Sequence, residues 1–219
     1  MTARRLADGP DSRVEAARVL ATGGIVAFPT DTVYGIAVAL GTPGGIERLF
    51  AAKARPPDRA IALLLADAAQ AGEIGELNAA ATALAAAFWP GGLTLVVPRR
   101  GDRPLPAALT GQDAPDVPTV GLRVPDHPAP RALAAAVGPL PTTSANRSGE
   151  PEAGDAVELE EQLGASLDLI LDGGPAHGGP ASTVVDTTSV PVRILRAGAI
   201  GLEGIDACLA SADLPGVGR

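Results

Sequence analysis

The stretch GGIVAFPTDTVYGIA, residues 23–37, carries the clearest signal of the fold. Its two glycines end an apolar-periodic segment that predicts a helix over residues 12–24, and IVAFP, residues 25–29, predicts a short buried strand directly after it. The same helix-then-strand order recurs along the chain. It predicts helices over residues 44–55, 78–89, 129–137 and 155–164, and strands over residues 60–66, 93–98, 119–125 and 167–174.

The last third of the sequence adds an antiparallel element to this pattern. STVVD, residues 182–186, and VRILR, residues 192–196, are apolar runs joined by the turn sequence TTSVP, which predicts a β-hairpin. PLPTTSANRSG, residues 139–149, contains too many turn formers to predict a helix or a strand. The order of elements therefore predicts an α/β fold in which helices cover the faces of a mixed parallel and antiparallel sheet.

Length and composition predict one domain. The 219 residues are 46% hydrophobic but only 2% aromatic, so the core must consist mainly of small aliphatic side chains. We expect a flexible N-terminus over residues 1–11, one folded domain over residues 12–205 and a loose tail over residues 206–219. Residues 101–118 lack periodicity, which is typical of a lid, a binding loop or a disordered segment.

Charge and residue usage exclude several classes of function. The net charge is -8, from 17 Lys and Arg against 25 Asp and Glu, which argues against tight non-specific binding of nucleic acid but still permits a small basic pocket. Cys208 is the only cysteine, so no internal disulfide can form, and a reducing cytoplasm is expected. No apolar run approaches the roughly 20 residues that span a bilayer. His127 and His177 do not have a metal-ligand spacing.

Polar residues follow the first expected strand, at the kind of position where α/β sheets bind ligands. Thr30, Asp31, Thr32 and Tyr34 offer hydroxyls and one carboxylate directly after residue 29. Taken alone, an ordinary turn capped by its own side chains is the simpler interpretation of this segment.

Three cations lie within seven residues at the end of the second expected helix: Lys53, Arg55 and Arg59. Cations at a helix C-terminus often only stabilise the helix, but two arginine forks and a lysine also suit a clamp for phosphates. The sequence contains neither a GxxxxGK[ST] phosphate loop nor a GxGxxG dinucleotide motif. A nucleotide would therefore need a different cradle.

Further polar candidates lie in the second half of the chain. Residues 142–148, TTSANRS, could cradle an oxyanion with backbone amides and hydroxyls, or could form a polar surface loop. Arg123 lies in an otherwise apolar strand, where an arginine either pairs with a carboxylate of the protein or binds one of a ligand. The same two interpretations apply to Arg193 and Arg196, and Ser182 begins a neighbouring strand.

Taken in order, these segments resemble the threonylcarbamoyl-AMP synthase family of the YrdC type over about residues 12–200. The family's Lys-x-Arg pair falls on Lys53 and Arg55, and its Ser-x-Asn pair on Ser144 and Asn146. Any one match is weak, but eight in register over most of a chain are specific. The matching stretches are GGIVAFPTDTVYGIA, IERLFAAKARP, FWPGGLTLVVP, VGLRVPDHP, TTSANRSGEP, ILDGG, STVVD and ILRAGAI.

The resemblance implies a twisted mixed sheet around a deep, positively charged cavity. It also implies a reaction in which L-threonine, bicarbonate and ATP give threonylcarbamoyl-AMP and pyrophosphate, for the threonylcarbamoyladenosine modification of tRNA. The residues implied in catalysis are Lys53, Arg55, Ser144 and Asn146. ATP, accompanied by Mg²⁺, would contact Lys53, Arg55, Arg59, Thr119, Ser144, Asn146 and Arg196. L-Threonine would contact Thr32, Arg123, Thr142 and Ser182. A downstream tRNA threonylcarbamoyl transferase would use the product, and direct binding of tRNA by this chain would be weak or absent.

One departure from the family pattern concerns the amino acid. The family usually has Pro-Leu and then a histidine that touches the amino acid, where this sequence has Ala60, Ile61 and Leu64. A leucine cannot donate a hydrogen bond. Two alternatives stay open: a diverged paralogue that makes another carbamoyl adenylate, and a non-catalytic RNA-binding module. The low isoelectric point and the few aromatic residues count against the second.

Overall fold

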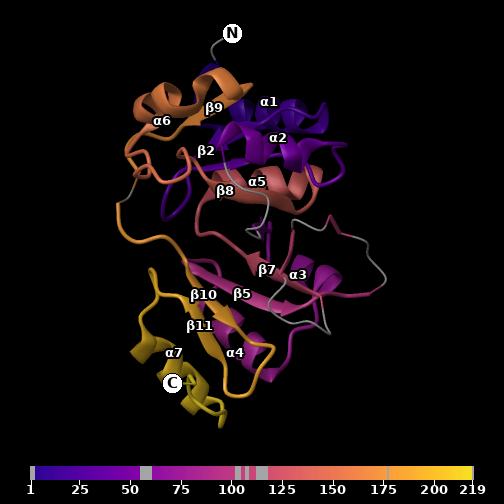
Figure 1. Ribbon diagram of the computed structural model, residues 1–219, viewed down its shortest axis with the longest axis vertical. Helices are drawn as coiled ribbons and strands as arrows, with labels where there is room; N and C mark the ends of the chain where they lie inside the picture. The colour runs from indigo at the N-terminus through magenta and orange to yellow at the C-terminus, as the bar shows by residue number, and fades with distance from the viewer. Residues whose placement is uncertain are drawn as a thin grey trace.

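One open sheet runs through the whole molecule (Figure 1). The computed structural model describes residues 3–54, 61–101, 105–106, 109–111, 118–176 and 178–218. Its strands there are β1 (Arg4–Ala7), β2 (Val26–Phe28), β3 (Gly35–Ala37), β4 (Ala62–Leu64), β5 (Leu93–Pro98), β6 (Thr110–Gly111), β7 (Thr119–Arg123), β8 (Leu140–Ser144), β9 (Leu169–Asp172), β10 (Thr183–Asp186) and β11 (Arg193–Arg196). Their order is β1-β9-β2-β3-β8-β4-β7-β5-β10-β11, and β6 pairs with β7 outside this path.

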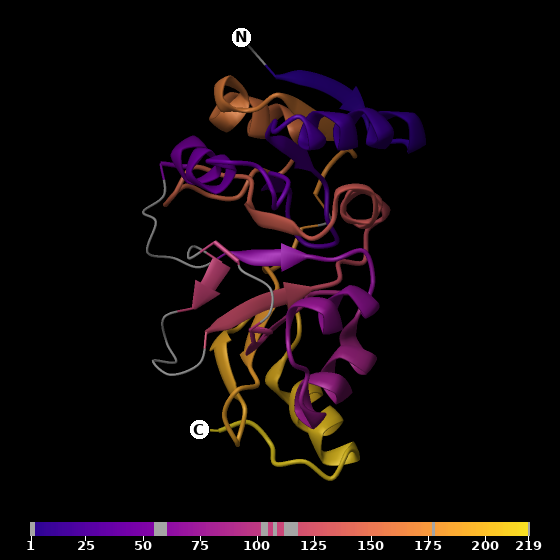
Figure 2. The same ribbon diagram turned by 90° about the vertical axis from the view of Figure 1, so that its right-hand side faces the viewer.

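The predicted mixed sheet is confirmed. The pairs β1–β9, β2–β9, β4–β7 and β5–β10 are parallel, whereas the pairs between β2, β3, β8 and β4 are antiparallel. The predicted hairpin is present as the antiparallel pair of β10 and β11. Strand direction turns along the sheet, so that β1 and β11 lie at opposite ends of the molecule with different orientations (Figures 1 and 2).

Seven α-helices lie within the described ranges. They are α1 (Pro10–Ala21), α2 (Gly45–Ala52), α3 (Ala69–Ile74), α4 (Ala79–Phe88), α5 (Pro128–Val137), α6 (Ala156–Leu163) and α7 (Leu202–Ser211). The helices α1, α2, α5 and α6 surround one end of the sheet, and α3, α4 and α7 lie at the other (Figures 1 and 2). Every helix in these ranges is too short or too polar to cross a membrane.

The end of the sheet around β9 and β2 is covered on both faces. Val26 and Phe28 pack with Leu20 of α1 and Leu133 of α5. Ala27, between them, belongs to the apolar cluster on the opposite face. Because successive side chains of a strand point to opposite faces, a strand covered on both must be apolar without a break, as IVAFP is.

The other end of the sheet buries one face and leaves the second open to a cavity. Leu95 of β5 and Leu122 of β7 belong to the same buried cluster as Leu84 of α4. Their neighbours Thr94 and Gly121 point the other way and line a cavity. The alternation that builds the core here also exposes the residues that form the candidate site.

Residues 139–149 were expected to contain neither a helix nor a strand, and this is wrong for their first part. Leu140–Ser144 form β8, an interior strand between β3 and β4. Proline cannot donate to a strand ladder, so Pro141 argued against a strand here. The pairing with β3 covers only Thr142–Ser144, so Pro141 lies beyond that ladder, and its partner in the sheet is Leu63 of β4 on the other side. Burial of Leu140 in the sheet then outweighs the local turn preference.

The segment expected to be a flexible N-terminus contains regular secondary structure from residue 4 onward. Arg4–Ala7 form the edge strand β1, parallel to β9, and α1 begins at Pro10. The strand has only one neighbour, so its side chains stay largely exposed and the polar sequence carries no strand period.

The segment expected to be a loose tail, residues 206–219, contains the second half of a helix and further backbone contacts up to residue 218. Helix α7 continues to Ser211 and buries Leu209. Beyond it, the Val217 amide donates to Asp206 Oδ1 at 2.8 Å, and the Gly218 amide donates to the Val192 carbonyl at 2.8 Å. The C-terminal segment therefore packs back against its own helix and the start of β11.

Candidate functional site

A cavity of about 520 Å³ lies over the open face of β8, β4, β7 and β5, bounded by the turn after β2 and by β10 and β11. Its size is typical of sites for small molecules. It is lined by Thr30, Thr32, Val33, Tyr34, Gly35, Ile61, Ala62, Leu64, Thr94, Val96, Thr119, Gly121, Arg123, Thr142, Thr143, Ser144, Glu152, Ala181, Ser182, Val184, Asp186, Thr188, Leu195 and Arg196.

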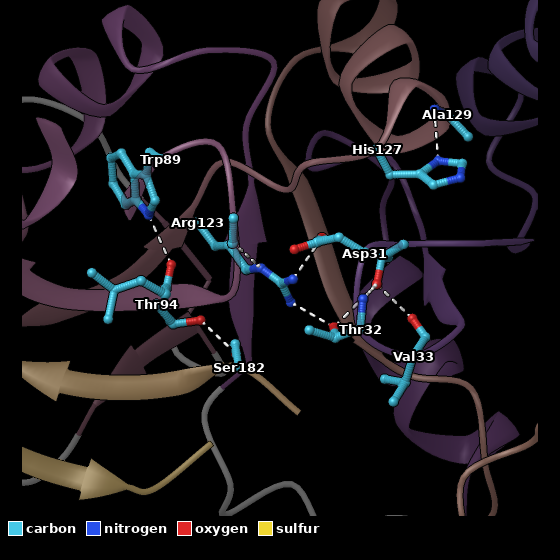
Figure 3. A network of polar contacts seen from close by, with 12 residues as sticks. Asp31, Thr32, Val33, Trp89, Thr94, Arg123, His127, Ala129 and Ser182 are labelled. Carbon is cyan, nitrogen blue, oxygen red and sulfur yellow. Dashed lines mark hydrogen bonds and ion pairs between the residues drawn. The ribbon is translucent and has the colours of Figure 1, made fainter. Parts of the chain in front are cut away.

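Arg123 is the cation on the cavity wall that the protein holds most firmly. Its Nε donates to the Gly91 carbonyl at 3.0 Å, one terminal nitrogen to Thr32 Oγ1 at 3.1 Å and the other to Asp31 Oδ1 at 2.7 Å (Figure 3). The residue is 6% exposed. Burial lowers the pKa of Arg123, and the adjacent Asp31 carboxylate opposes that shift. These three bonds use three of five N–H groups, so the guanidinium keeps donors for a ligand.

The turn after β2 is stiffened by its own hydroxyls. Thr30 Oγ1 donates to the Val33 carbonyl at 2.6 Å and accepts from the Thr32 amide at 3.1 Å. The buried Tyr34 hydroxyl donates to the Gly174 carbonyl at 2.7 Å and accepts from the Gly173 amide at 3.0 Å, and burial raises the pKa of this phenol. The segment thus forms the self-capped turn expected from its sequence and also lines the cavity.

Ser182 and Arg196 meet on the opposite wall. Two nitrogens of Arg196 donate to the Ser182 carbonyl at 3.1 and 2.7 Å, and one of them also donates to Ser182 Oγ at 3.0 Å. Ser182 Oγ in turn lies 2.9 Å from Thr94 Oγ1 (Figure 3). Gly198 permits this approach, because a Cβ there would lie 2.2 Å from the Ala181 carbonyl oxygen.

Lys53, Ser144 and Asn146 form a third cluster, and they come from the end of α2 and the end of β8. The Lys53 ammonium donates to the Ser144 carbonyl, to Ser144 Oγ at 3.0 Å and to Asn146 Oδ1 at 3.0 Å. Ser144 Oγ lies 2.7 Å from Asn146 Oδ1. Only Ser144 of the three lines the cavity, while Lys53 and Asn146 are buried behind it.

The structure brings together most of the residues named from the sequence. Lining the cavity are Thr32, Thr119, Arg123, Thr142, Ser144, Ser182 and Arg196. Lys53 and Asn146 do not line the cavity, but both contact the hydroxyl of Ser144, which does. The hydroxyl of Thr142 donates to the Leu140 carbonyl at 2.8 Å, so this side chain is already engaged in β8. Arg55 and Arg59 lie outside the described residues, as do His177 and most of residues 101–118, which were expected to be a lid, a binding loop or a disordered segment.

Charges on the described part of the cavity wall are mixed. Arg123 and Arg196 line it together with Glu152 and Asp186. Burial lowers the pKa of Arg196; the Glu152 carboxylate opposes this shift, and the charge of Arg123 adds to it. The positively charged cavity expected from the family stays a prediction, because it depends partly on Arg55 and Arg59. Among the residues described, no group of three His, Cys, Asp or Glu side chains could hold a metal ion.

Asp31, Thr94 and Glu152 are among the residues at the site that were not selected from the sequence. Asp31 was seen only as part of a turn, although it is the partner of Arg123. Thr94 interrupts the apolar run LTLVVP in the same way that Arg123 interrupts its strand, so a comparable signal was available. No comparable sequence signal marked Glu152, because it lies in the irregular segment before α6.

The family model described as "Telomere recombination", for the group Sua5, YciO and YrdC, matches residues 18–198. The chain belongs to this Sua5–YciO–YrdC family. Among its relatives, a threonylcarbamoyl-AMP synthase of Bacillus subtilis is 36% identical over 198 residues, which are 89% of this chain and 56% of that protein. A putative threonylcarbamoyl-AMP synthase of Mycobacterium tuberculosis is 36% identical over 88% of this chain and 86% of its own length.

Solved members of the Sua5–YciO–YrdC family share the fold. Sua5 of Pyrococcus abyssi, crystallised with L-threonine, superposes with a TM-score of 0.85 at 33% identity, over 98% of this chain and 61% of that one. YciO of Escherichia coli matches in fold with a TM-score of 0.80 at 23% identity, over 93% and 98% of the two chains. The chain spans little more than half the length of the Bacillus and Pyrococcus proteins.

Proposed function

We propose that this chain is a threonylcarbamoyl-AMP synthase, which makes threonylcarbamoyl-AMP and pyrophosphate from L-threonine, bicarbonate and ATP. The observation that carries the proposal is the buried guanidinium of Arg123, which is fixed by Asp31 and Thr32 and belongs to a residue that lines a cavity of about 520 Å³. A relative with the same fold, Sua5 of P. abyssi, was crystallised with L-threonine.

In this proposal the amino acid lies between the turn after β2 and β10. The N–H groups of Arg123 that Gly91, Thr32 and Asp31 do not use suit the carboxylate of L-threonine, because a hydrogen bond from a guanidinium to a carboxylate is charge-assisted. Thr32, Thr142 and Ser182 line the same region. The hydroxyls of Thr32 and Ser182 contact the two arginines, so both ends of the amino-acid subsite are oriented before a ligand arrives.

The nucleotide would occupy the part of the cavity bounded by Thr119, Ser144 and Arg196, with Lys53 and Asn146 behind Ser144. The family resemblance adds Arg55 and Arg59 to the proposed contacts of ATP. The threonine amine is first carboxylated by bicarbonate: the amine nitrogen bonds to the bicarbonate carbon, one C–O bond breaks, and water leaves with the proton from the amine. One oxygen of the resulting carbamate then attacks the α-phosphorus of ATP, and pyrophosphate leaves with the electron pair of the broken P–O bond. Such a transfer needs mainly positioned reactants and cations facing the phosphate oxygens.

Mg²⁺ would enter bound to the triphosphate, since protein sites often hold this ion through substrate phosphates and one or two carboxylates. Glu152 and Asp186 are the described carboxylates on the cavity wall. The ion neutralises charge on the phosphates. The product would pass to a tRNA threonylcarbamoyl transferase in the cytoplasm, with at most weak binding of tRNA by this chain.

The test is formation of pyrophosphate that depends on all three substrates, with the nucleotide product identified by mass spectrometry. Two arginines of β11 provide a matched pair of variants. Arg196→Met should raise the KM for ATP about tenfold, because it removes a charge-assisted bond at the cavity. Arg193→Met should change it less than about twofold, since Arg193 pairs with Asp186 instead. Pyrophosphate release without L-threonine would contradict the proposal.

Leu64 supports a second candidate, a paralogue that uses another amino acid. Leu64 is 4% exposed and lines the cavity, so an apolar side chain stands where the family usually has a histidine. Product formation with a panel of single amino acids separates the two candidates. Leu64→His should lower the KM for L-threonine if threonine is the substrate. RNA binding with a steep salt dependence and no pyrophosphate would instead favour a non-catalytic module.

A further inference from the structure

The ammonium of Lys53 is already fully engaged by the protein. An ammonium has three N–H groups, and within the described part of the chain Lys53 Nζ contacts three acceptors: the Ser144 carbonyl, Ser144 Oγ and Asn146 Oδ1. The residue is 3% exposed and does not line the cavity, whereas Ser144 does. A phosphate oxygen would have to displace one of these acceptors before it could contact Lys53.

The orientation of the Asn146 amide determines which way the Ser144 hydrogen points. Asn146 Nδ2 lies 3.1 Å from the Arg147 carbonyl and 2.6 Å from the Glu150 carbonyl, and only the NH₂ end of an amide can donate to both. Oδ1 therefore faces Ser144, and an amide oxygen cannot donate. Ser144 must donate its single hydrogen to Asn146 Oδ1, over 2.7 Å.

Ser144 consequently has one position left for a ligand, and it is a lone pair. Its hydrogen is bound to Asn146, and one lone pair accepts from Lys53. A phosphate oxygen would meet an acceptor there rather than a donor. A metal ion would lie beside the Lys53 ammonium, 3.0 Å from the same oxygen, where like charges repel.

We infer that Lys53 is a positioning residue, which together with Asn146 fixes the Ser144 hydroxyl as a hydrogen-bond acceptor for an N–H or O–H of a substrate. The inference rests on the proposed function, and it replaces the direct contact of Lys53 with ATP that the sequence suggested. Both L-threonine and the nucleoside part of ATP carry such donors. Whichever of them has its KM raised by Ser144→Ala is the ligand at this position.

A double-mutant cycle separates positioning from direct contact. Ser144→Ala should raise one KM about tenfold, as expected for the loss of a hydrogen bond in a dry site. Lys53→Met alone should raise the same KM by a similar factor. When Ser144 is already alanine, Lys53→Met should raise that KM less than about twofold, because its effect depends on the Ser144 hydroxyl. Arg196→Met is the control, because it faces the cavity separately and its factor should multiply with that of Ser144→Ala. The inference would be overturned if the KM factors of Lys53→Met and Ser144→Ala multiplied in the double variant. It would also be overturned if Ser144→Ala left both KM values unchanged.

Lys53 is also the only lysine in the sequence, which permits a measurement on the unmodified chain. Lysine labelled with ¹⁵N at Nζ gives a single side-chain ammonium signal. We expect slowly exchanging protons before ligand is added, and no coupling to ³¹P when ATP is added. A coupling to ³¹P would overturn the inference even if Lys53→Met failed to fold.

The cycle is measured on the dissociation constants of ATP and L-threonine as well as on turnover. If the chain binds both ligands but forms no pyrophosphate, the proposed activity is contradicted, and the cycle can still be measured on the dissociation constants. If the chain is active but the effects of Lys53→Met and Ser144→Ala multiply in the double variant, only the role of Lys53 is contradicted.

Discussion

Two arginine–aspartate pairs flank the cavity with the same separation but very different exposure. Arg123 and Asp31 are 2.7 Å apart, with side chains 7% and 15% exposed. Arg193 and Asp186 are also 2.7 Å apart, but here only the aspartate is buried: the side chain of Arg193 is 56% exposed and that of Asp186 is 6% exposed. The first pair joins β7 to the turn after β2, over 92 positions of sequence, and the second joins neighbouring strands of a hairpin.

The difference shows that distance alone does not decide what an ion pair contributes. A buried guanidinium has lost its hydration, so removal of its partner leaves an uncompensated charge. An exposed guanidinium exchanges its partner for water at little cost. The pair at Arg123 can thus hold a cation on the cavity wall, whereas the pair at Arg193 mainly orders the hairpin.

Loss of the buried partner should have the largest effect. We expect Asp31→Ala to lower the free energy of unfolding by about 3–5 kcal/mol and to abolish turnover, because Arg123 would lose both its charge partner and its orientation. Chemical denaturation and the pyrophosphate assay measure the two effects.

The control is Asp8→Ala, which breaks the pair of Asp8 with Arg13, also at 2.7 Å, near the far edge of the sheet. It should cost stability but leave the KM for L-threonine unchanged. A stable, active Asp31→Ala variant would show that the Arg123 pair is dispensable.

Asp186 should have an intermediate effect that depends on pH. Burial raises its pKa, but hydrogen bonds from Thr188 and Arg193 outweigh burial and hold the pKa below the usual 3.8. The Asp186 carboxylate therefore stabilises the folded chain at pH values above its pKa in the unfolded chain. This contribution is lost as the pH falls through the lower pKa that Asp186 has in the folded chain. We expect Asp186→Asn to cost about 1 kcal/mol at pH 7 and progressively less below about pH 4. Unfolding curves over this range test the sign, and a difference that grows on acidification would contradict it.

Arg193→Met should have the smallest effect, within about 0.5 kcal/mol of the parent at moderate salt, because the Arg193 guanidinium is exposed and Thr188 still donates two hydrogen bonds to Asp186. Thermal unfolding at low and high ionic strength measures it. A loss as large as that of Asp31→Ala would remove the distinction between the two pairs.

Periodic segments were predicted well because their signal is local. Strand β5 spans residues 93–98 as expected, and the hairpin of β10 and β11 follows from two apolar runs and a turn sequence. By contrast, β3 has only three residues and α3 only six, which is too short to show a period. Strand β8 contains Pro141 and was mistaken for a loop.

The sequence by itself determined which residues were available: cations after α2 and in the strands, hydroxyls at strand ends, and apolar runs to bury between them. Only the tertiary structure decided their partners. Lys53 meets Ser144 across 91 positions, and Arg123 meets Asp31 across 92. Contacts at that separation depend on strand order and register across the whole sheet, and no local preference of the chain specifies those.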